Sequence, residues 1–261
     1  MRRSHTPVLA ALAACSLFAA ACSDDAAAPA ATPGDGATGT VVVFAASSLS
    51  EAFAAMAEAF HAANPQAEVT FNFAGSADLV TQISEGAPAD VFVSADDSNM
   101  AKITDAELQA TDPVIVARNT FSIIVEQGNP KGIATLADLA DPDVIVVLCA
   151  DTVPCGKGAA TILANAAVTV SPKSLEDKVK GVVTKVASGE ADAGIVFVTD
   201  VRAADGAADG IDIPDDVNVI SNYPIVVTKD SRNPDAAQAF IEFVAGAEGQ
   251  AILAKYGFLA P

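Results

Sequence analysis

The chain has 261 residues, of which 51% are hydrophobic and 18% are charged, and it contains no tryptophan. This composition is typical of a globular protein and excludes a disordered or fibrous one. With 14 basic and 33 acidic residues, the formal net charge is −19. Binding to nucleic acid or to anionic membrane surfaces is disfavoured, because both need clustered cations.

The first 21 residues have the pattern of an export signal. Arg2 and Arg3 form a basic segment, and residues 7–21 are an apolar run too short to span a membrane comfortably. The small residues before Cys22 are similar to the cleavage site of bacterial lipoproteins, although the Leu-Ala-Ala before Cys15 fits the preference of that site better. We expect lipidation at Cys22, because the polar segment begins directly after it. The alternative is an ordinary secretory signal.

Residues 22–39 are predicted to form a flexible tether. After Cys22 this segment consists of small and polar residues together with proline, so it cannot bury enough apolar surface to offset the entropy of ordering. Folding is therefore expected from Thr40 onward, over 222 residues, which is enough for one large domain or two α/β lobes. Loss of residues 1–21 makes the chain more acidic, with a net charge of −21.

From Thr40 onward, short β-branched runs alternate with helical patterns. Residues 40–44 predict a buried strand, and residues 48–62 predict a helix with apolar side chains at three- and four-residue spacing. Further strands are predicted at 68–73, 89–94, 144–148 and 194–198, and further helices at 78–84, 99–104, 158–166, 179–187 and 234–254. Such alternation indicates a mainly parallel sheet covered by helices.

Two β-rich stretches, 112–126 and 217–229, are long for single strands, and each has a polar break. The breaks are Arg118-Asn119 and Ser221-Asn222. We interpret both stretches as strands that cross between two lobes. The predicted fold is therefore α/β, with two lobes that each contain a mainly parallel sheet flanked by helices. Lobe 1 is expected at residues 40–119 plus 225–261, and lobe 2 at residues 120–224.

Three predicted helices begin directly after strands, in turns made of small residues. Ser48 precedes Glu51 by three residues, as in a capping box, and Ser76 stands before another acidic first turn. The third helix follows residues 149–158, which contain two glycines. A serine at one such turn is usually only a cap. Several helix starts at one sheet edge can present free N–H groups to an anion, and ligands of open α/β folds bind at that edge.

Cys149 and Cys155 are the only cysteines of the expected folded part, and in an exported chain so close a pair is expected to form a disulfide. A zinc site would need more ligands, and His61 is the only histidine in this part. No G-x-S-x-G segment is present, and Gly156-Lys157-Gly158 lacks the other residues of a P-loop. We therefore expect no enzyme and no site for a free metal cation.

Seven segments occur in the order found in the periplasmic molybdate-binding proteins of ABC importers, which the chain resembles over nearly all of residues 40–261. They are VFAASSL at 43–49, FAGSADL at 73–79, GAPADVFVSAD at 86–96, VPCG at 153–156, GIVFVTD at 194–200, NYPIVV at 222–227 and KYGF at 255–258. The resemblance implies a two-lobed type II periplasmic-binding-protein fold, which closes by a hinge on a tetrahedral oxyanion. We expect the hinge at the two polar breaks.

The resemblance also implies a ligand, molybdate or tungstate, that is held without counter-charge and without a cofactor. The matching positions are the hydroxyls and amides of Ser48 and Ser76, the amides of Cys155 and Val196, and the hydroxyl of Tyr223. Relatives often have alanine at the position of Cys155, but the contact is made by the backbone. A site composed of donors rejects protonated anions, whose O–H group would be left unpaired.

From the N-terminal signal pattern, the protein is expected to be exported and either periplasmic or lipid-anchored to the outer face of the cell membrane. It is expected to be a monomer that delivers its ligand to the transmembrane subunits of an ABC permease. One alternative is a sulfate or phosphate binder, with Asp78 or Asp151 as acceptor. A ferric-ion binder would need more than the two tyrosines and one histidine of this part. An adhesion module would need an exposed apolar patch.

Overall fold

The computed structural model describes residues 36–261. The predicted export signal at 1–21, the lipidation site at Cys22 and most of the predicted tether lie outside these residues. Within residues 36–261, none of the helices has the length and apolar character needed to cross a membrane.

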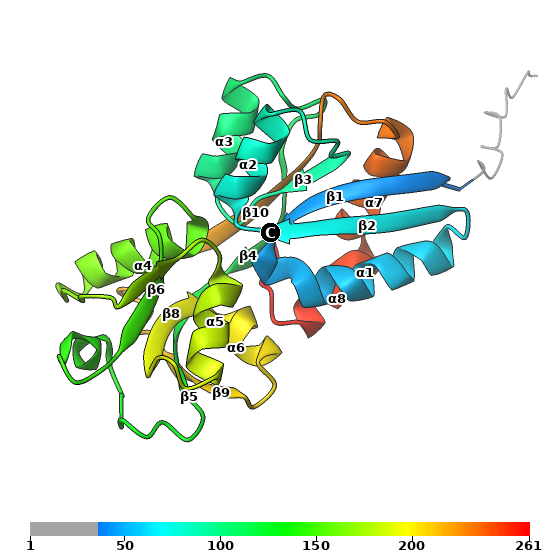
Figure 1. Cartoon of the computed structure of the whole chain (residues 1–261). Coiled ribbons are helices and arrows are strands. Elements are labelled where there is room, and N and C mark those ends of the chain that lie inside the picture. The colour runs from blue at the N-terminus through cyan, green and yellow to red at the C-terminus, as the bar shows by residue number, and fades with distance from the viewer. Residues whose placement is uncertain (1–35) are drawn as a thin grey trace, which may run out of the picture. The chain divides into compact units, whose positions relative to one another are not determined.

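The first of two five-stranded sheets has the strand order β2-β1-β3-β10-β4 (Figure 1). Its strands are β1 (Gly39–Ala46), β2 (Ala67–Ala74), β3 (Val91–Val93), β4 (Val114–Asn119) and β10 (Ser221–Val227). β1 pairs in parallel with β2 and β3, whereas β10 is antiparallel to β3 and β4. The helices of this part are α1 (Ser50–Ala63), α2 (Ser76–Ser84), α3 (Asp97–Asp105), α7 (Pro234–Ala245) and α8 (Ala247–Lys255), with a short 3₁₀ turn, η1 (Ser47–Leu49), before α1.

Both faces of this sheet are buried, because its central strands carry apolar residues at odd and even positions alike. In β1, Val43 and Ala45 belong to the core under α1 and α7, whereas Phe44 packs with the residues of α2 and α3. In β3, Val91 and Val93 face the first core, and Phe92 faces the second. Successive side chains of a strand point to opposite faces, so helices are required on both sides.

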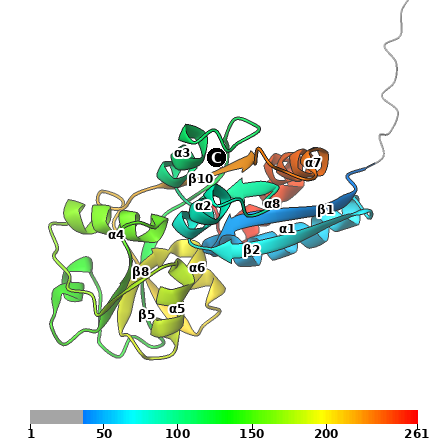
Figure 2. The same ribbon diagram turned by 45° about the horizontal axis from the view of Figure 1, so that its top comes forward.

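The second sheet has the order β7-β6-β8-β5-β9 and packs with α4, α5 and α6 (Figures 1 and 2). Its strands are β5 (Phe121–Glu126), β6 (Val146–Cys149), β7 (Ser174–Glu176), β8 (Ala193–Phe197) and β9 (Ala208–Asp212). The helices are α4 (Pro154–Asn165), α5 (Val179–Ala187) and α6 (Val198–Ala203), with a 3₁₀ helix, η2 (Leu136–Ala140), before β6. The expected α/β fold with two sheet-containing lobes is confirmed, but the sheets are mixed and not mainly parallel. In the second sheet β6 is parallel to β7 and β8, whereas β5 is antiparallel to β8 and β9.

The chain passes between the sheets at two places, and these places are neighbours. β4 ends at Asn119 in the first sheet and β5 begins at Phe121 in the second, so one strand-like stretch of sequence is two strands. On the return, Ser221 pairs with Asn119 and Asn222 pairs with Arg118. The two polar breaks therefore lie side by side. β10 belongs as a whole to the first sheet, so the lobe boundary expected between residues 224 and 225 falls inside a strand.

The long helical pattern at 234–254 forms two helices, α7 and α8, and not the single helix that its spacing predicts. Gly246 lies between them in an extended conformation, with φ −74° and ψ 172°. At Gly249, a Cβ atom would stand only 2.3 Å from the carbonyl oxygen of Phe243. The close approach of α8 to the end of α7 needs glycine at this position. The spacing of apolar residues does not indicate such a requirement.

Candidate functional site

Helix starts from both lobes surround a small cavity between the sheets. From the first lobe it is lined by Ala46, Ser47, Ser48, Ala74, Gly75, Ser76 and Ala95, and from the second by Val153, Pro154, Cys155, Lys178, Val179 and Phe197. The volume of the cavity is about 10 Å³, which is about the room that one water molecule needs. The sequence-predicted Ser48, Ser76 and Cys155 are therefore brought together.

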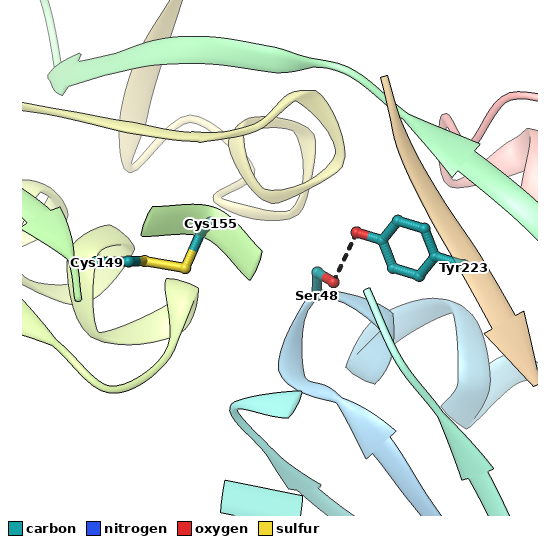
Figure 3. Close-up of a disulfide and its surroundings, with 4 residues drawn as sticks. All are labelled: Ser48, Cys149, Cys155 and Tyr223. Carbon is teal, nitrogen blue, oxygen red and sulfur yellow. Dashed lines mark hydrogen bonds between the residues drawn. A yellow bond between two sulfur atoms is a disulfide. The ribbon is translucent and has the colours of Figure 1, made fainter. Parts of the chain in front are cut away.

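Ser48 lies in the 3₁₀ turn directly after β1 and is only 4% exposed. Its Oγ is 2.9 Å from the phenol oxygen of Tyr223 in β10 (Figure 3). Asn119 Nδ2 donates to the same phenol oxygen at 3.4 Å, which favours Tyr223 as the donor to Ser48. The hydroxyl proton of Ser48 is then free to point at a ligand.

Ser76 is the first residue of α2 and is 1% exposed. Its Oγ accepts a hydrogen bond of 3.1 Å from the amide of Ala95. The hydroxyl proton of Ser76 is again left for another acceptor. Both serine oxygens thus accept a hydrogen bond from the protein, which leaves each hydroxyl proton to be donated towards the cavity.

The capping expectations for both serines are wrong. Neither makes a side-chain cap: the residue before α1 is Leu49, and the residue before α2 is Gly75. Glu51 does not close a capping box with Ser48 but pairs with Lys180 of the second lobe. A capping box and a tertiary hydrogen bond compete for the same hydroxyl, and here the tertiary partner prevails.

The start of α4 brings Cys155 to the cavity from the second lobe. Cys155 is the second helical residue, after Pro154, and amides at this position have no acceptor inside the helix. Cys149, the last residue of β6, is bonded to Cys155 through their sulfurs, and Ser48 and Tyr223 face this disulfide from the first lobe (Figure 3). At Gly156 a Cβ atom would meet the carbonyl oxygen of Ala150 at 1.9 Å. The turn after β6 therefore needs glycine at this position.

The start of α5 is a second contribution of this lobe that the sequence analysis missed. Val179 is the first residue of α5, and Lys178 before it makes no side-chain cap, so the first amides of the helix are not capped. Both residues line the cavity. The sequence predicted that a helix begins at residue 179. The turn before this helix contains no serine or glycine, which are the residues that marked the other helix starts as candidate sites.

Two predicted site residues are not among those that line the cavity. Val196 is fully buried in β8 opposite Ser122, and the residue of this strand that lines the cavity is Phe197. Tyr223 is also fully buried and lies behind Ser48. The phenol ring of Tyr223 packs edge-on against Phe197, with ring centroids 5.9 Å apart.

A buried carboxylate of the second lobe, Asp200, pairs with Lys180 beside the site. Burial raises the pKa of Asp200 to about 6, against the opposing effect of Lys180, whose Nζ is 3.2 Å from Asp200 Oδ1. Burial also raises the pKa of Tyr223, so its hydroxyl keeps its proton at neutral pH. Among the described residues that line the cavity, Lys178 is the one cationic residue, and none carries a carboxylate. The cavity lining therefore includes one cationic residue, although the resemblance implies a ligand held without counter-charge.

Residues 41–259 match the model of a family described as bacterial extracellular solute-binding protein. The chain belongs to this family. It is 40% identical over 222 residues to the molybdate-binding protein ModA of Mycobacterium tuberculosis, covering 85% of each chain.

Two solved structures with a similar fold are also named for molybdenum or molybdate. One is the substrate-binding domain of a putative molybdenum ABC transporter from Clostridium difficile, with 28% identity and a TM-score of 0.64 over 85% of this chain and 99% of that one. The periplasmic molybdate-binding protein of Azotobacter vinelandii, 19% identical, has a TM-score of 0.73 over 85% and 99% of the two chains. The fold of periplasmic binding proteins expected from the resemblance is confirmed.

Proposed function

We propose that this solute-binding protein captures molybdate or tungstate in the cavity between its lobes and delivers it to an ABC permease. The observation that carries the proposal is the arrangement of two buried serine hydroxyls, both with their oxygens already bonded by protein donors, opposite the uncapped starts of α4 and α5. Such a site offers hydrogen-bond donors and helix N-termini, which suit a fully deprotonated oxyanion. The 40% identity to a protein named for molybdate binding supports the choice of ligand.

The ligand groups that we assign are the hydroxyls of Ser48 and Ser76 and the amides of Cys155 and Val179. We place the fourth group at Val179, and not at the expected Val196, because Val179 lines the cavity. Tyr223 acts through Ser48, since its hydroxyl bonds Ser48 Oγ. Protonated phosphate needs an acceptor, and neither Asp78 nor Asp151 is among the lining residues.

The groups that line the cavity come from both lobes, so the lobes must part for an anion to enter or leave. We place the hinge at the adjacent segments Arg118-Asn119 and Ser221-Asn222, where the chain passes between the sheets. We expect small-angle scattering to show a smaller radius of gyration when molybdate is added. An unchanged radius would contradict the hinge motion.

Calorimetry with molybdate, tungstate, sulfate and phosphate tests the ligand and the site together. We expect binding of molybdate and tungstate, and weak or no binding of the other two. A hydrogen bond to a charged ligand contributes about 1.5–3 kcal/mol, so Ser48→Ala and Ser76→Ala should each weaken binding about 10- to 100-fold. Ser84→Ala, at the exposed far end of α2, is the control. Sulfate binding as tight as that of molybdate would refute the assigned ligand.

We also propose that the protein is an exported monomer, anchored by lipid at Cys22. The polar composition of the segment after Cys22 supports the anchor, because such a segment acts as a tether. Mass spectrometry of the protein from its native membrane should find a diacylated N-terminal cysteine. An unmodified N-terminus would place the protein free in the periplasm.

A further inference from the structure

Two lysines of the second lobe reach across the cleft to carboxylates of the first. Lys180 Nζ in α5 is 2.9 Å from both Glu51 Oε1 and Glu51 Oε2 in α1. Lys157 Nζ in α4 is 3.0 Å from Asp96 Oδ2, the residue that caps α3. Within residues 36–261 these are the two ion pairs that join the lobes, since the other three lie inside the second lobe.

Both pairs lie next to the groups that line the cavity. In the first pair, Lys180 directly follows Val179, and Glu51 is three residues after Ser48. In the second pair, Lys157 is two residues after Cys155. Its partner Asp96 directly follows Ala95, the residue whose amide binds Ser76 Oγ. The closure that brings the cavity-lining groups of the two lobes together therefore also forms the pairs.

Both pairs are partly shielded from solvent. The side chains of Lys180 and Glu51 are 24% and 41% exposed, and those of Lys157 and Asp96 are 34% and 15% exposed. Salt screens such partly buried pairs less than fully exposed ones. Lys180 is also held in place by the fully buried Asp200, which has no other ion-pair partner among the described residues.

We propose that the Glu51–Lys180 and Asp96–Lys157 pairs are latches that hold the lobes closed and set the rate at which the bound anion is released. The inference rests on the proposed function and names positioning residues for it. Because the pairs exist only when the lobes are together, they stabilise the closed state and not the open one. Their loss speeds release of the anion and leaves its association with the open form unchanged.

The test uses Lys157→Met and Glu51→Gln, separately and together. Glu51→Gln is preferred to a change of Lys180, because it leaves Lys180 to neutralise the buried Asp200. The matched controls are Lys131→Met and Glu58→Gln. Lys131 pairs with Asp192 inside the second lobe at 3.6 Å, and Glu58 is an exposed residue on the same helix as Glu51.

The readout is the release of radiolabelled molybdate from the full-length protein after addition of excess unlabelled molybdate. Each latch variant should release about two- to fivefold faster than its control, and the double variant faster still. Association rates and unfolding temperatures should match those of the controls. If the pairs only stabilised the fold, the unfolding temperatures of the variants would fall. Added salt should speed release from the unchanged protein more than from the double variant.

Release at the control rate in both latch variants would refute the proposed latches and leave the proposed function standing. Failure of the unchanged protein to bind any of the four oxyanions overturns the proposed function, and the latches with it. Unfolding temperatures that fall together with faster release would assign the pairs a structural role in place of the latch.

Discussion

Replacing Gly75 by alanine should keep the lobes from closing fully while leaving each lobe folded. Gly75 has φ −64° and ψ 140°, an ordinary conformation for any residue. A Cβ atom there would lie 2.2 Å from the carbonyl oxygen of Asp177, and its other near neighbours are also in the second lobe. Since real Cβ atoms essentially never approach closer than 3.0 Å, the two lobes must separate locally by at least about 0.8 Å.

A separation of this size is enough to break the hydrogen bonds that reach a ligand from one lobe, because such bonds weaken steeply beyond their normal length. The loss of two of them at about 1.5 kcal/mol or more each predicts binding that is at least about 100-fold weaker. The unfolding temperature should stay unchanged or rise slightly, since alanine restricts the unfolded chain.

Calorimetry with molybdate measures the affinity, and thermal unfolding followed by circular dichroism measures the stability. Gly246→Ala, at the junction of α7 and α8, is the control. Unchanged affinity in Gly75→Ala would refute the reasoning, because the approach of Gly75 to Asp177 would then not belong to the ligand-bound state. Weaker affinity together with a lower unfolding temperature would point to damage within a lobe.

Three further predictions concern the groups around the cavity. Tyr223→Phe removes the donor to Ser48, so calorimetry should show about 10-fold weaker molybdate binding; unchanged affinity would contradict its assigned role. Replacing Cys149 and Cys155 by alanine should lower the free energy of unfolding by about 2 kcal/mol in urea titrations, since the disulfide closes a short loop; it should also weaken molybdate binding, because the amide beside the cavity is held less firmly, and equal affinity would contradict that link. The pKa of Asp200, raised by burial to about 6, lies above its unfolded value, so its contribution to stability is complete below about pH 4 and is lost as the pH rises through about 6. Asp200→Asn should therefore become more stable relative to the unchanged protein between pH 4 and pH 7 in urea titrations, and a difference that does not vary with pH would disprove the assignment.

Local sequence patterns predicted most elements of the fold. Strand β1 and helices α1 and α5 were predicted from β-branched runs and helical spacing, because burial of a face imposes a fixed period on the sequence. Polar breaks at Arg118-Asn119 and Ser221-Asn222 marked the two places where the chain passes between the sheets, and these segments pair with each other. The small residues after the strands also predicted three of the helix starts that meet at the cavity, those at Ser48, Ser76 and Cys155, but not the start of α5.

The sequence by itself determined the α/β alternation, and it predicted most helix starts and a site composed of donors, since these depend on residues close together in the chain. Only the tertiary structure decided which partner each side chain takes. The local spacing predicts that Ser48 and Glu51 cap one helix together. In the structure Ser48 bonds Tyr223, 175 residues away, and Glu51 bonds Lys180, 129 residues away. The same limit applies to Val179, which lines the cavity where Val196 was expected. A hydroxyl, carboxylate or amide can satisfy a local and a distant partner equally well, and the packing of the two lobes fixes which one lies within reach.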